Sequence, residues 1–278
     1  MYELKCFPCT AKKACLYATH LAKGLAPVSI RNYLSAVWYK QKMYGFQDFS
    51  SDFMLSQTLN GIERAYDYST HVVKYPLKPI DLLNMYKLLD MNVLDDVLFW
   101  VAALVCFRGL LRVCHVTNSP HNLRVGNVTV HQGYVEFRIT SSKSDQFGKK
   151  TFSVIINDIV DSPLCISTHV KRLLKGASKK DFLLCHVVGG IRFPMDYSYV
   201  NCRLQLLAQT VNLPVNRIST HCFRHGGATM LKDLDLPVSS IMIRGNWRSS
   251  AVHRYLHQST RELLKMEQIP CSYMSGLI

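Results

Sequence analysis

Two adjacent glycines in a helical stretch constrain this chain more than any other feature of its sequence. They are Gly226 and Gly227, in the run His221-Cys222-Phe223-Arg224-His225-Gly226-Gly227-Ala228-Thr229. A glycine in a helix costs about 1 kcal/mol relative to alanine, so the natural reason for a pair of them is a close approach by another backbone. We therefore predict that a second segment of the chain packs directly against this helix at the glycine pair.

The same stretch, residues 219–257, carries side chains that can act on a phosphate. His221 and Arg224 are three residues apart, so on a helix they lie on one face and can reach one anion together. A guanidinium binds phosphate through two parallel hydrogen bonds, and an imidazole can donate or accept a proton near neutral pH. Tyr255 follows among basic residues and supplies a hydroxyl that can attack phosphorus.

This stretch resembles the carboxyl-terminal motif of the tyrosine recombinases, the phage-integrase family. A His-x-x-Arg pair alone occurs by chance in many chains, but five ordered elements are far more specific. The resemblance is strongest over residues 105–257 and extends more loosely to the helical run 29–37. The elements of the motif are filled, in order, by His221, Arg224, Ala228-Thr229, Gly245 with Trp247, and Tyr255.

The predicted fold class is mainly α with a small antiparallel β-sheet. The resemblance implies a helical core-binding domain, residues 1–68, followed by a mixed α/β catalytic domain of the DNA breaking-rejoining type, residues 79–278. Apolar residues at helical spacing predict three helical segments within residues 10–66, and a polar stretch closed by two prolines, 69–78, is predicted as the linker. Later helices are expected at 81–89, 93–107, 167–174 and 197–211, with a basic loop at 175–180 and an apolar segment at 182–188.

From residue 127 the hydrophobic period changes to two. The alternation predicts three short antiparallel strands, with turns at Gln132-Gly133 and around residues 144–148. Lys143 stands at the mouth of the second turn, and the resemblance places a catalytic lysine on this hairpin; Lys149 and Lys150 are alternatives. Residues 142–148 look especially like the hairpin of recombinases from eukaryotic DIRS-like and Crypton mobile elements. The alternating residues are Val128, Val130, Val135, Phe137, Ile139, Phe152, Val154 and Ile156.

A first catalytic arginine is expected after the apolar helix at 93–107. In the resembled family it stands in a Leu-Arg context, and Arg112 fits that position better than Arg108. The family often has Glu or Asp three residues later, where this chain has His115. The sequence leaves open which group supports Arg112.

The resemblance implies a transesterification that needs no metal or other cofactor. Arg112 and Arg224 would clamp the phosphate, and Tyr255 would attack it to form a 3′-phosphotyrosine. A free phenol has a pKa of about 10, so the nucleophile needs a base, for which His221 is the candidate. Lys143 would protonate the departing 5′-oxygen.

Trp247 is the candidate for a further phosphate contact through its indole N–H. In most relatives the corresponding His or Trp lies nine residues before the tyrosine, where this chain has Asn246. Either a one-residue contraction brings Trp247 to that position, or Asn246 donates instead.

Composition points to a polyanionic partner. Lysine and arginine number 33 against 19 acidic residues, a net charge of +14, which fits double-stranded DNA. Ten cysteines without a signal peptide indicate an intracellular protein, and Cys6-x-x-Cys9 lacks a second ligand pair for zinc. No apolar run is long enough to cross a membrane. A nuclear location follows only from the likeness to eukaryotic elements.

The function predicted from these features is site-specific DNA recombination or integration, with protomers assembling as dimers to tetramers on paired DNA sites. Two alternatives remain open at this point. One is a type IB topoisomerase-like relaxase, which would use the same chemistry as a monomer. The other is a domesticated element that binds DNA and no longer cleaves it.

Overall fold

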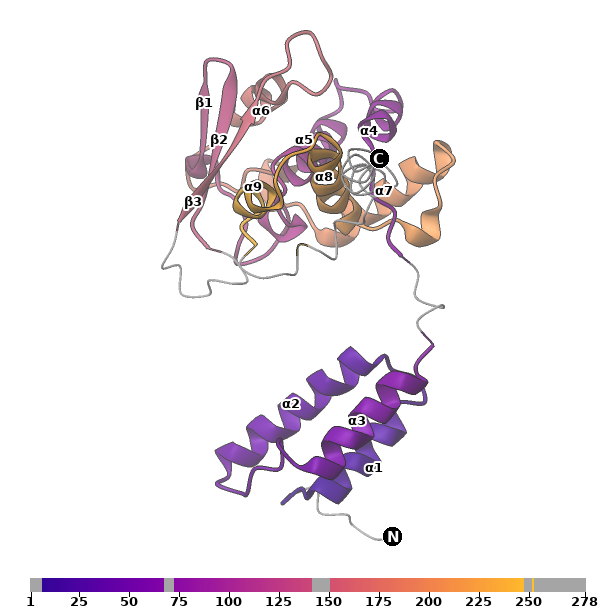
Figure 1. Cartoon of the computed structure of the whole chain (residues 1–278). Coiled ribbons are helices and arrows are strands. Elements are labelled where there is room, and N and C mark those ends of the chain that lie inside the picture. The colour runs from indigo at the N-terminus through magenta and orange to yellow at the C-terminus, as the bar shows by residue number, and fades with distance from the viewer. Residues whose placement is uncertain (1–6, 68–72, 142–150, 248–251, 253–278) are drawn as a thin grey trace, which may run out of the picture. The chain divides into compact units, whose positions relative to one another are not determined.

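The computed structural model describes residues 7–67, 73–141, 151–247 and 252. The chain divides into two compact units, residues 1–71 and 72–278, and each has its own hydrophobic core. The described residues are mainly helical (Figure 1). They also form one three-stranded and one two-stranded antiparallel sheet. The fold class predicted from the sequence is confirmed.

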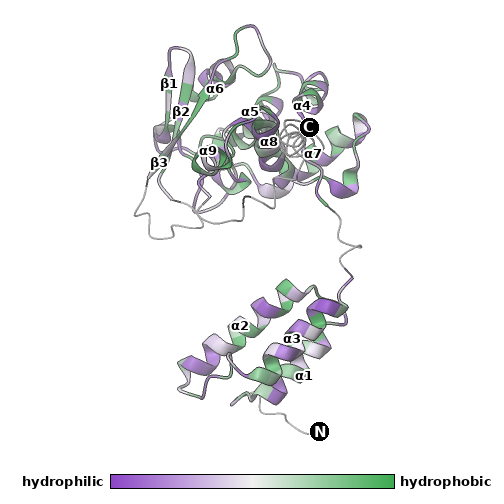
Figure 2. Cartoon of the chain, in the orientation of Figure 1, coloured by the Kyte–Doolittle hydropathy of each residue, from purple (hydrophilic) through white to green (hydrophobic). Residues whose placement is uncertain are grey.

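The first unit is a bundle of three helices, at the positions that the apolar spacing predicted. Thr10 and Asp52 cap the first and third helices by accepting hydrogen bonds from backbone N–H groups, and Pro27 opens the second. Apolar residues alternate with polar ones along each helix (Figure 2), and the apolar ones, such as Ile30 and Leu34, form the core. The helices are α1 (Ala11–Leu21), α2 (Pro27–Met43) and α3 (Phe53–Ala65).

The second unit is built around α5 (Leu94–Arg108), whose residues from Asp96 to Phe107 are all buried. A helix that is apolar on every side is stable only when other elements surround it. Helices α6, α7 and α8 pack against it. The other helices of this unit are α4 (Pro79–Tyr86), α6 (Ile166–Leu174), α7 (Tyr197–Thr210), α8 (His221–Asp233) and α9 (Val238–Arg244), with short 3-10 turns η2 (Val113–His115), η3 (Val125–Asn127) and η4 (Val215–Arg217).

The three-stranded sheet has the order β1-β2-β3 and is antiparallel throughout, as the period-two pattern predicted (Figure 1). Gly133 makes the first turn with a φ of 85°, a conformation that glycine adopts without strain. Val135, Phe137 and Ile139 point into the core from the central strand. The strands are β1 (Val128–His131), β2 (Tyr134–Ile139) and β3 (Phe152–Asn157).

A second sheet was not predicted. Residues 182–188 were expected only as an apolar segment, but β4 (Cys185–Val188) pairs with β5 (Ile191–Pro194) in a hairpin. Gly189 and Gly190 form its turn, both with positive φ, which is the conformation that a two-residue hairpin turn requires.

Residues 73–78, predicted as part of the linker, pack on the second unit. The N–H groups of Tyr75 and Leu77 donate to the carbonyls of Arg217 and Cys222, and the Leu77 side chain is buried. The two backbone hydrogen bonds hold this segment beside α8 (His221–Asp233) and the chain that precedes it. That helix begins at His221 with Thr220 as its N-cap.

Candidate active site

Helix α8 is held against two other backbones at its glycine pair. A Cβ on Gly226 would lie 2.0 Å from the Leu77 carbonyl oxygen, and a Cβ on Gly227 would lie 2.0 Å from that of Phe107. Any larger residue would force the segments apart, so the predicted close approach is confirmed. This close packing holds α8 between residues 73–77 and the end of α5. Arg224 lies on the same helix just before the glycine pair, so the packing also fixes its position.

Arg224 is the buried centre of the site. Only 3% of it is exposed, and its two terminal nitrogens donate to the carbonyls of Leu110 (2.6 Å) and Gly245 (2.7 Å). Leu110 has a φ of 52°, a left-handed conformation that costs a non-glycine residue free energy. The arginine therefore joins the turn after α5 to the end of α9.

Trp247 stacks on Arg224. The guanidinium carbon lies 3.9 Å from the ring centroid, within the range of a cation–π contact. The ring also lies so close to Gly245 that a Cβ there would come 1.8 Å from a ring carbon. Asn246, with a φ of 50°, makes the turn between them. The structure thus brings Trp247 to the arginine, while Asn246 shapes the backbone.

The two arginines that follow the apolar helix have different surroundings. Arg108 donates to the carbonyls of Leu164 and Asn157, each at 2.7 Å, and burial lowers its pKa. Arg112 is half-buried and precedes η2, and its side chain makes no hydrogen bond or ion pair within the described part of the chain. Arg108 therefore ties backbone segments together, and Arg112 is the one available to a ligand.

His115 lies within electrostatic range of both site arginines. It is buried, and its Nδ1 lies 3.1 Å from the carbonyl oxygen of His121. Because a carbonyl only accepts, Nδ1 carries the proton in the neutral ring and Nε2 keeps a lone pair. Burial, with smaller contributions from the charges of Arg112 and Arg224, lowers the pKa of His115 to about 4. At pH 7 this residue is neutral, so it adds no charge of its own beside the two arginines.

The remaining predicted residues are described only in part. His221 is exposed and is the first residue of α8. Lys143, its alternatives Lys149 and Lys150, and the proposed nucleophile Tyr255 lie outside the described residues.

The chain next to two of these residues is described. Ser141, two residues before Lys143, has its Oγ 3.0 Å from His121 Nδ1, and the His121 ring is 6.3 Å from that of His115. Val252 is buried in one cluster with Trp247 and Leu110. Tyr255 follows three residues later in the sequence, outside the described residues. The described residues thus bring Arg112, His115, Arg224 and Trp247 together.

His115 and the carbonyl partners of Arg224 were not predicted as site residues. The sequence does carry a signal for His115, which is its position three residues after Arg112. The sequence carries no signal for the two carbonyls that accept from Arg224, because every residue has a backbone carbonyl.

Comparison with solved structures places this arrangement in a known fold. No protein-family model matches the sequence, and no curated protein does. The XerH site-specific recombinase bound to difH substrate superposes with a TM-score of 0.64 at 15% identity, over 94% of this chain and 70% of that one. The chain has the fold of the tyrosine recombinases.

Two further tyrosine recombinases of known structure agree. The Tn1549 transposon integrase in complex with circular intermediate DNA gives a TM-score of 0.57 at 15% identity, over 94% of this chain and 85% of that one. A lambda integrase dimer bound to a core site gives 0.53 at 14% identity, over 92% and 82%. At such identities the likeness concerns the fold, and the resemblance noted in the motif is confirmed at that level.

Proposed function

We propose that this protein is a site-specific DNA recombinase that cuts and rejoins DNA strands through a 3′-phosphotyrosine intermediate. One observation carries the proposal. Within the tyrosine recombinase fold, Arg112 and Arg224 both act electrostatically on a buried, neutral His115. Two positive charges around a neutral side chain favour a phosphate, whose charge they would stabilise in the transition state.

Each arginine has its own part in this chemistry. Arg224 is held by two carbonyls and an aromatic ring, so it supplies a preorganised charge at the base of the site. Arg112 makes no hydrogen bond or ion pair with another described side chain, and it supplies the donors that reach the non-bridging oxygens. Phosphoryl transfer depends mainly on positioning and charge stabilisation, which these two roles provide.

The covalent step follows from the remaining residues. The Tyr255 oxygen attacks phosphorus in line and gives its proton to His221, while the bond from phosphorus to the 5′-oxygen breaks. Lys143 donates a proton to that oxygen, which leaves as a 5′-hydroxyl. The 5′-hydroxyl of a second strand reverses the same steps and releases Tyr255. The number of phosphodiester bonds is unchanged, so no cofactor or energy source is needed.

The partners proposed are double-stranded DNA and further copies of the same chain. Net charge of +14 supports the first. The second is supported by the lambda integrase relative, whose solved structure is a dimer on its core site. A role in mobile-element integration or excision rests on the resemblance to eukaryotic elements and on the transposon integrase among the structural relatives. A nuclear location rests on that resemblance alone.

A specific observation favours one alternative, a DNA-binding protein without cleavage activity. Arg224 is 3% exposed and two of its nitrogens donate to carbonyls. If DNA does not reach this guanidinium, the clamp is incomplete and only binding remains.

A nicked suicide substrate tests the proposal. Wild type, Tyr255→Phe and the control Tyr197→Phe, whose side chain is exposed on α7, are incubated with pooled DNA that flanks the gene and scored for a denaturation-resistant adduct. Wild type and the control should form the adduct, also in EDTA, and Tyr255→Phe should bind DNA without forming it. Binding by wild type with no adduct on any substrate would establish the alternative, and supercoil relaxation by isolated monomers would indicate a topoisomerase.

A further inference from the structure

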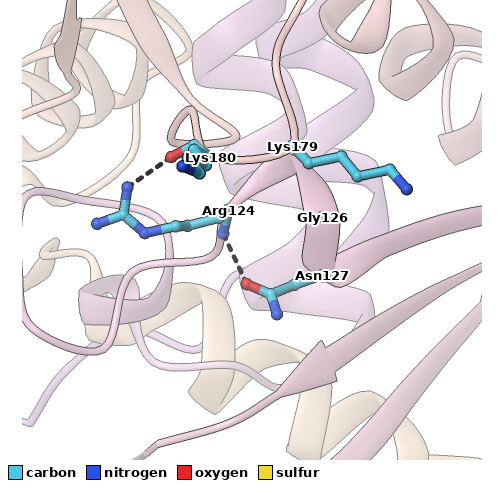
Figure 3. A pocket seen from close by; sticks show the side chains of 5 residues that line it. All are labelled: Arg124, Gly126, Asn127, Lys179 and Lys180. Atoms are coloured by element: carbon cyan, nitrogen blue, oxygen red, sulfur yellow. Dashed lines mark hydrogen bonds between the residues drawn. The ribbon is translucent and has the colours of Figure 1, made fainter.

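A shallow pocket of about 400 Å³ is lined by residues that do not belong to the candidate active site. It is lined by Arg124, Gly126, Asn127, Lys179 and Lys180 (Figure 3). Three of these five residues are cations and none is an acid. The sequence analysis found only a basic loop at 175–180 and gave it no chemistry.

The pocket is formed by two segments bonded backbone to backbone. The N–H groups of Val125 and Gly126 donate to the carbonyls of Asp181 and Lys179, each at 2.9 Å. A Cβ on Gly126 would lie 3.0 Å from the Lys179 carbonyl oxygen, so glycine permits the contact. The basic loop is therefore held at a fixed position against η3.

Arg124 is fixed from two sides. One terminal nitrogen donates to the Lys180 carbonyl at 2.6 Å, and the guanidinium carbon lies 4.2 Å from the centroid of the Phe182 ring. Stacking and a hydrogen bond together reduce the side-chain freedom that an arginine loses on binding a ligand. Figure 3 shows the side chains of Arg124 and Lys179 extending to opposite sides of the pocket.

The acceptors that join the two segments of the pocket are already engaged. The carbonyls of Lys179, Lys180 and Asp181 are all occupied by the bonds to residues 124–126. Asn127 Oδ1 accepts a hydrogen bond from the backbone N–H of Arg124, so the Asn127 side-chain NH₂ group remains as a donor for a ligand. The neighbouring Asp181 carboxylate is engaged by the Ser178 N–H and by Arg192. A guanidinium, two ammonium groups and an amide NH₂ match an anion with several acceptor oxygens.

We propose that this pocket binds backbone phosphates of duplex DNA outside the position of cleavage. The inference rests on the proposed function for its ligand. Phosphate contacts fix the position of a protein on the duplex without reading sequence, and a rigid arginine flanked by two flexible lysines suits consecutive phosphates along one strand.

The test is the salt dependence of binding to a fluorescein-labelled DNA duplex, measured by anisotropy for the full chain. Lys179→Gln/Lys180→Gln removes two exposed charges and leaves the Lys180 carbonyl bond in place. Each phosphate contact contributes about 0.9 to the slope of log affinity against log salt, so the slope should fall by about 2. The control Lys87→Gln/Lys171→Gln changes the net charge equally at exposed positions outside the pocket and should leave the slope nearer that of wild type.

A second variant tests the arginine. Arg124→Lys keeps the charge but loses the planar group that stacks on Phe182, and it should weaken DNA binding several-fold with the thermal unfolding midpoint almost unchanged. Equal slopes for the lysine pair, the control pair and wild type would overturn the inference. The outcome is independent of cleavage: steep binding without an adduct contradicts only the proposed recombinase, and an adduct with unchanged slopes contradicts only this site.

Discussion

The guanidinium of Arg224 lies against the indole ring of Trp247, 3.9 Å from guanidinium carbon to ring centroid, with both residues more than nine-tenths buried. Two carbonyl oxygens accept hydrogen bonds from the same guanidinium. Carbonyl dipoles and an aromatic face therefore stabilise its positive charge. A carboxylate there would neutralise the charge that the phosphate needs. Packing of α8, α9 and the turn after α5 therefore sets the electrostatics of the site.

Substitutions at Trp247 separate its packing from its N–H group. Trp247→Ala should reduce the free energy of unfolding by about 3 to 5 kcal/mol, since a large buried ring is lost. Trp247→Phe keeps an aromatic face on Arg224 and should cost less than half of that, while lowering the adduct yield if the indole N–H supports the phosphate. Urea unfolding and the adduct assay measure the two effects. An unchanged yield in Trp247→Phe would remove the N–H from the mechanism and leave Trp247 as a packing residue.

The glycine pair makes a prediction about stability. Gly227→Ala places a Cβ 2.0 Å from the Phe107 carbonyl oxygen, so α8 must move away from α5 and the variant should lose several kcal/mol or fail to fold. Gly61→Ala is the matched control, because Gly61 lies inside α3 with open space around its Cα. That change should stabilise the first unit by up to about 1 kcal/mol. Similar thermal unfolding midpoints for the two variants would contradict the packing described for α8.

Much of this fold could be predicted because its signals are local. The three helices of the first unit follow from apolar spacing, and the three-stranded sheet follows from alternation between Val128 and Ile156. The glycine pair predicted a backbone contact, although its partners at Leu77 and Phe107 are more than a hundred residues away. A steric requirement is visible in the sequence even when the residues that satisfy it are not.

The features that could not be predicted depend on contacts between distant residues, or on contacts that leave no pattern in the sequence. In the hairpin of β4 and β5, Val188 and Ile191 are 65% and 62% exposed. The hairpin therefore has no alternation of buried apolar and exposed polar residues by which the sequence could have revealed it. The acceptors for Arg224 are carbonyls of Leu110 and Gly245. The neutral state of His115 arises from burial, which no motif encodes.

His115 should make stability depend on pH. Its folded pKa of about 4 is below the ordinary value of 6.5, so the unfolded chain binds a proton first as the pH falls. Stability is thus complete above about pH 6.5 and is lost as the pH falls toward 4, by about 2 kcal/mol between pH 7 and pH 5. The buried His169, whose pKa is also lowered by burial, adds a loss of the same sign.

The variant His115→Asn isolates this contribution. It keeps an N–H donor for the His121 carbonyl but does not titrate, so its free energy of unfolding should change by about 2 kcal/mol less than that of wild type over the same interval. The exposed His20→Asn should follow the wild-type profile. Parallel profiles for wild type and His115→Asn, measured by urea unfolding at each pH, would show that His115 is not held neutral.

The arginines after α5 give the last prediction, a reciprocal pair of effects. Arg108→Gln leaves the carbonyls of Leu164 and Asn157 without their donors and should reduce the free energy of unfolding by about 2 to 4 kcal/mol. Arg112→Gln breaks no hydrogen bond within the described residues, so its stability should stay within about 0.5 kcal/mol of wild type. Adduct formation should respond the other way, since removing one charge from a phosphate clamp costs a factor of about 100 to 1,000. Stability is measured by urea unfolding and the rate with the nicked substrate. If Arg112→Gln unfolds while Arg108→Gln stays folded and loses the adduct, the two assignments are exchanged, and the catalytic arginine is the one bonded to the backbone.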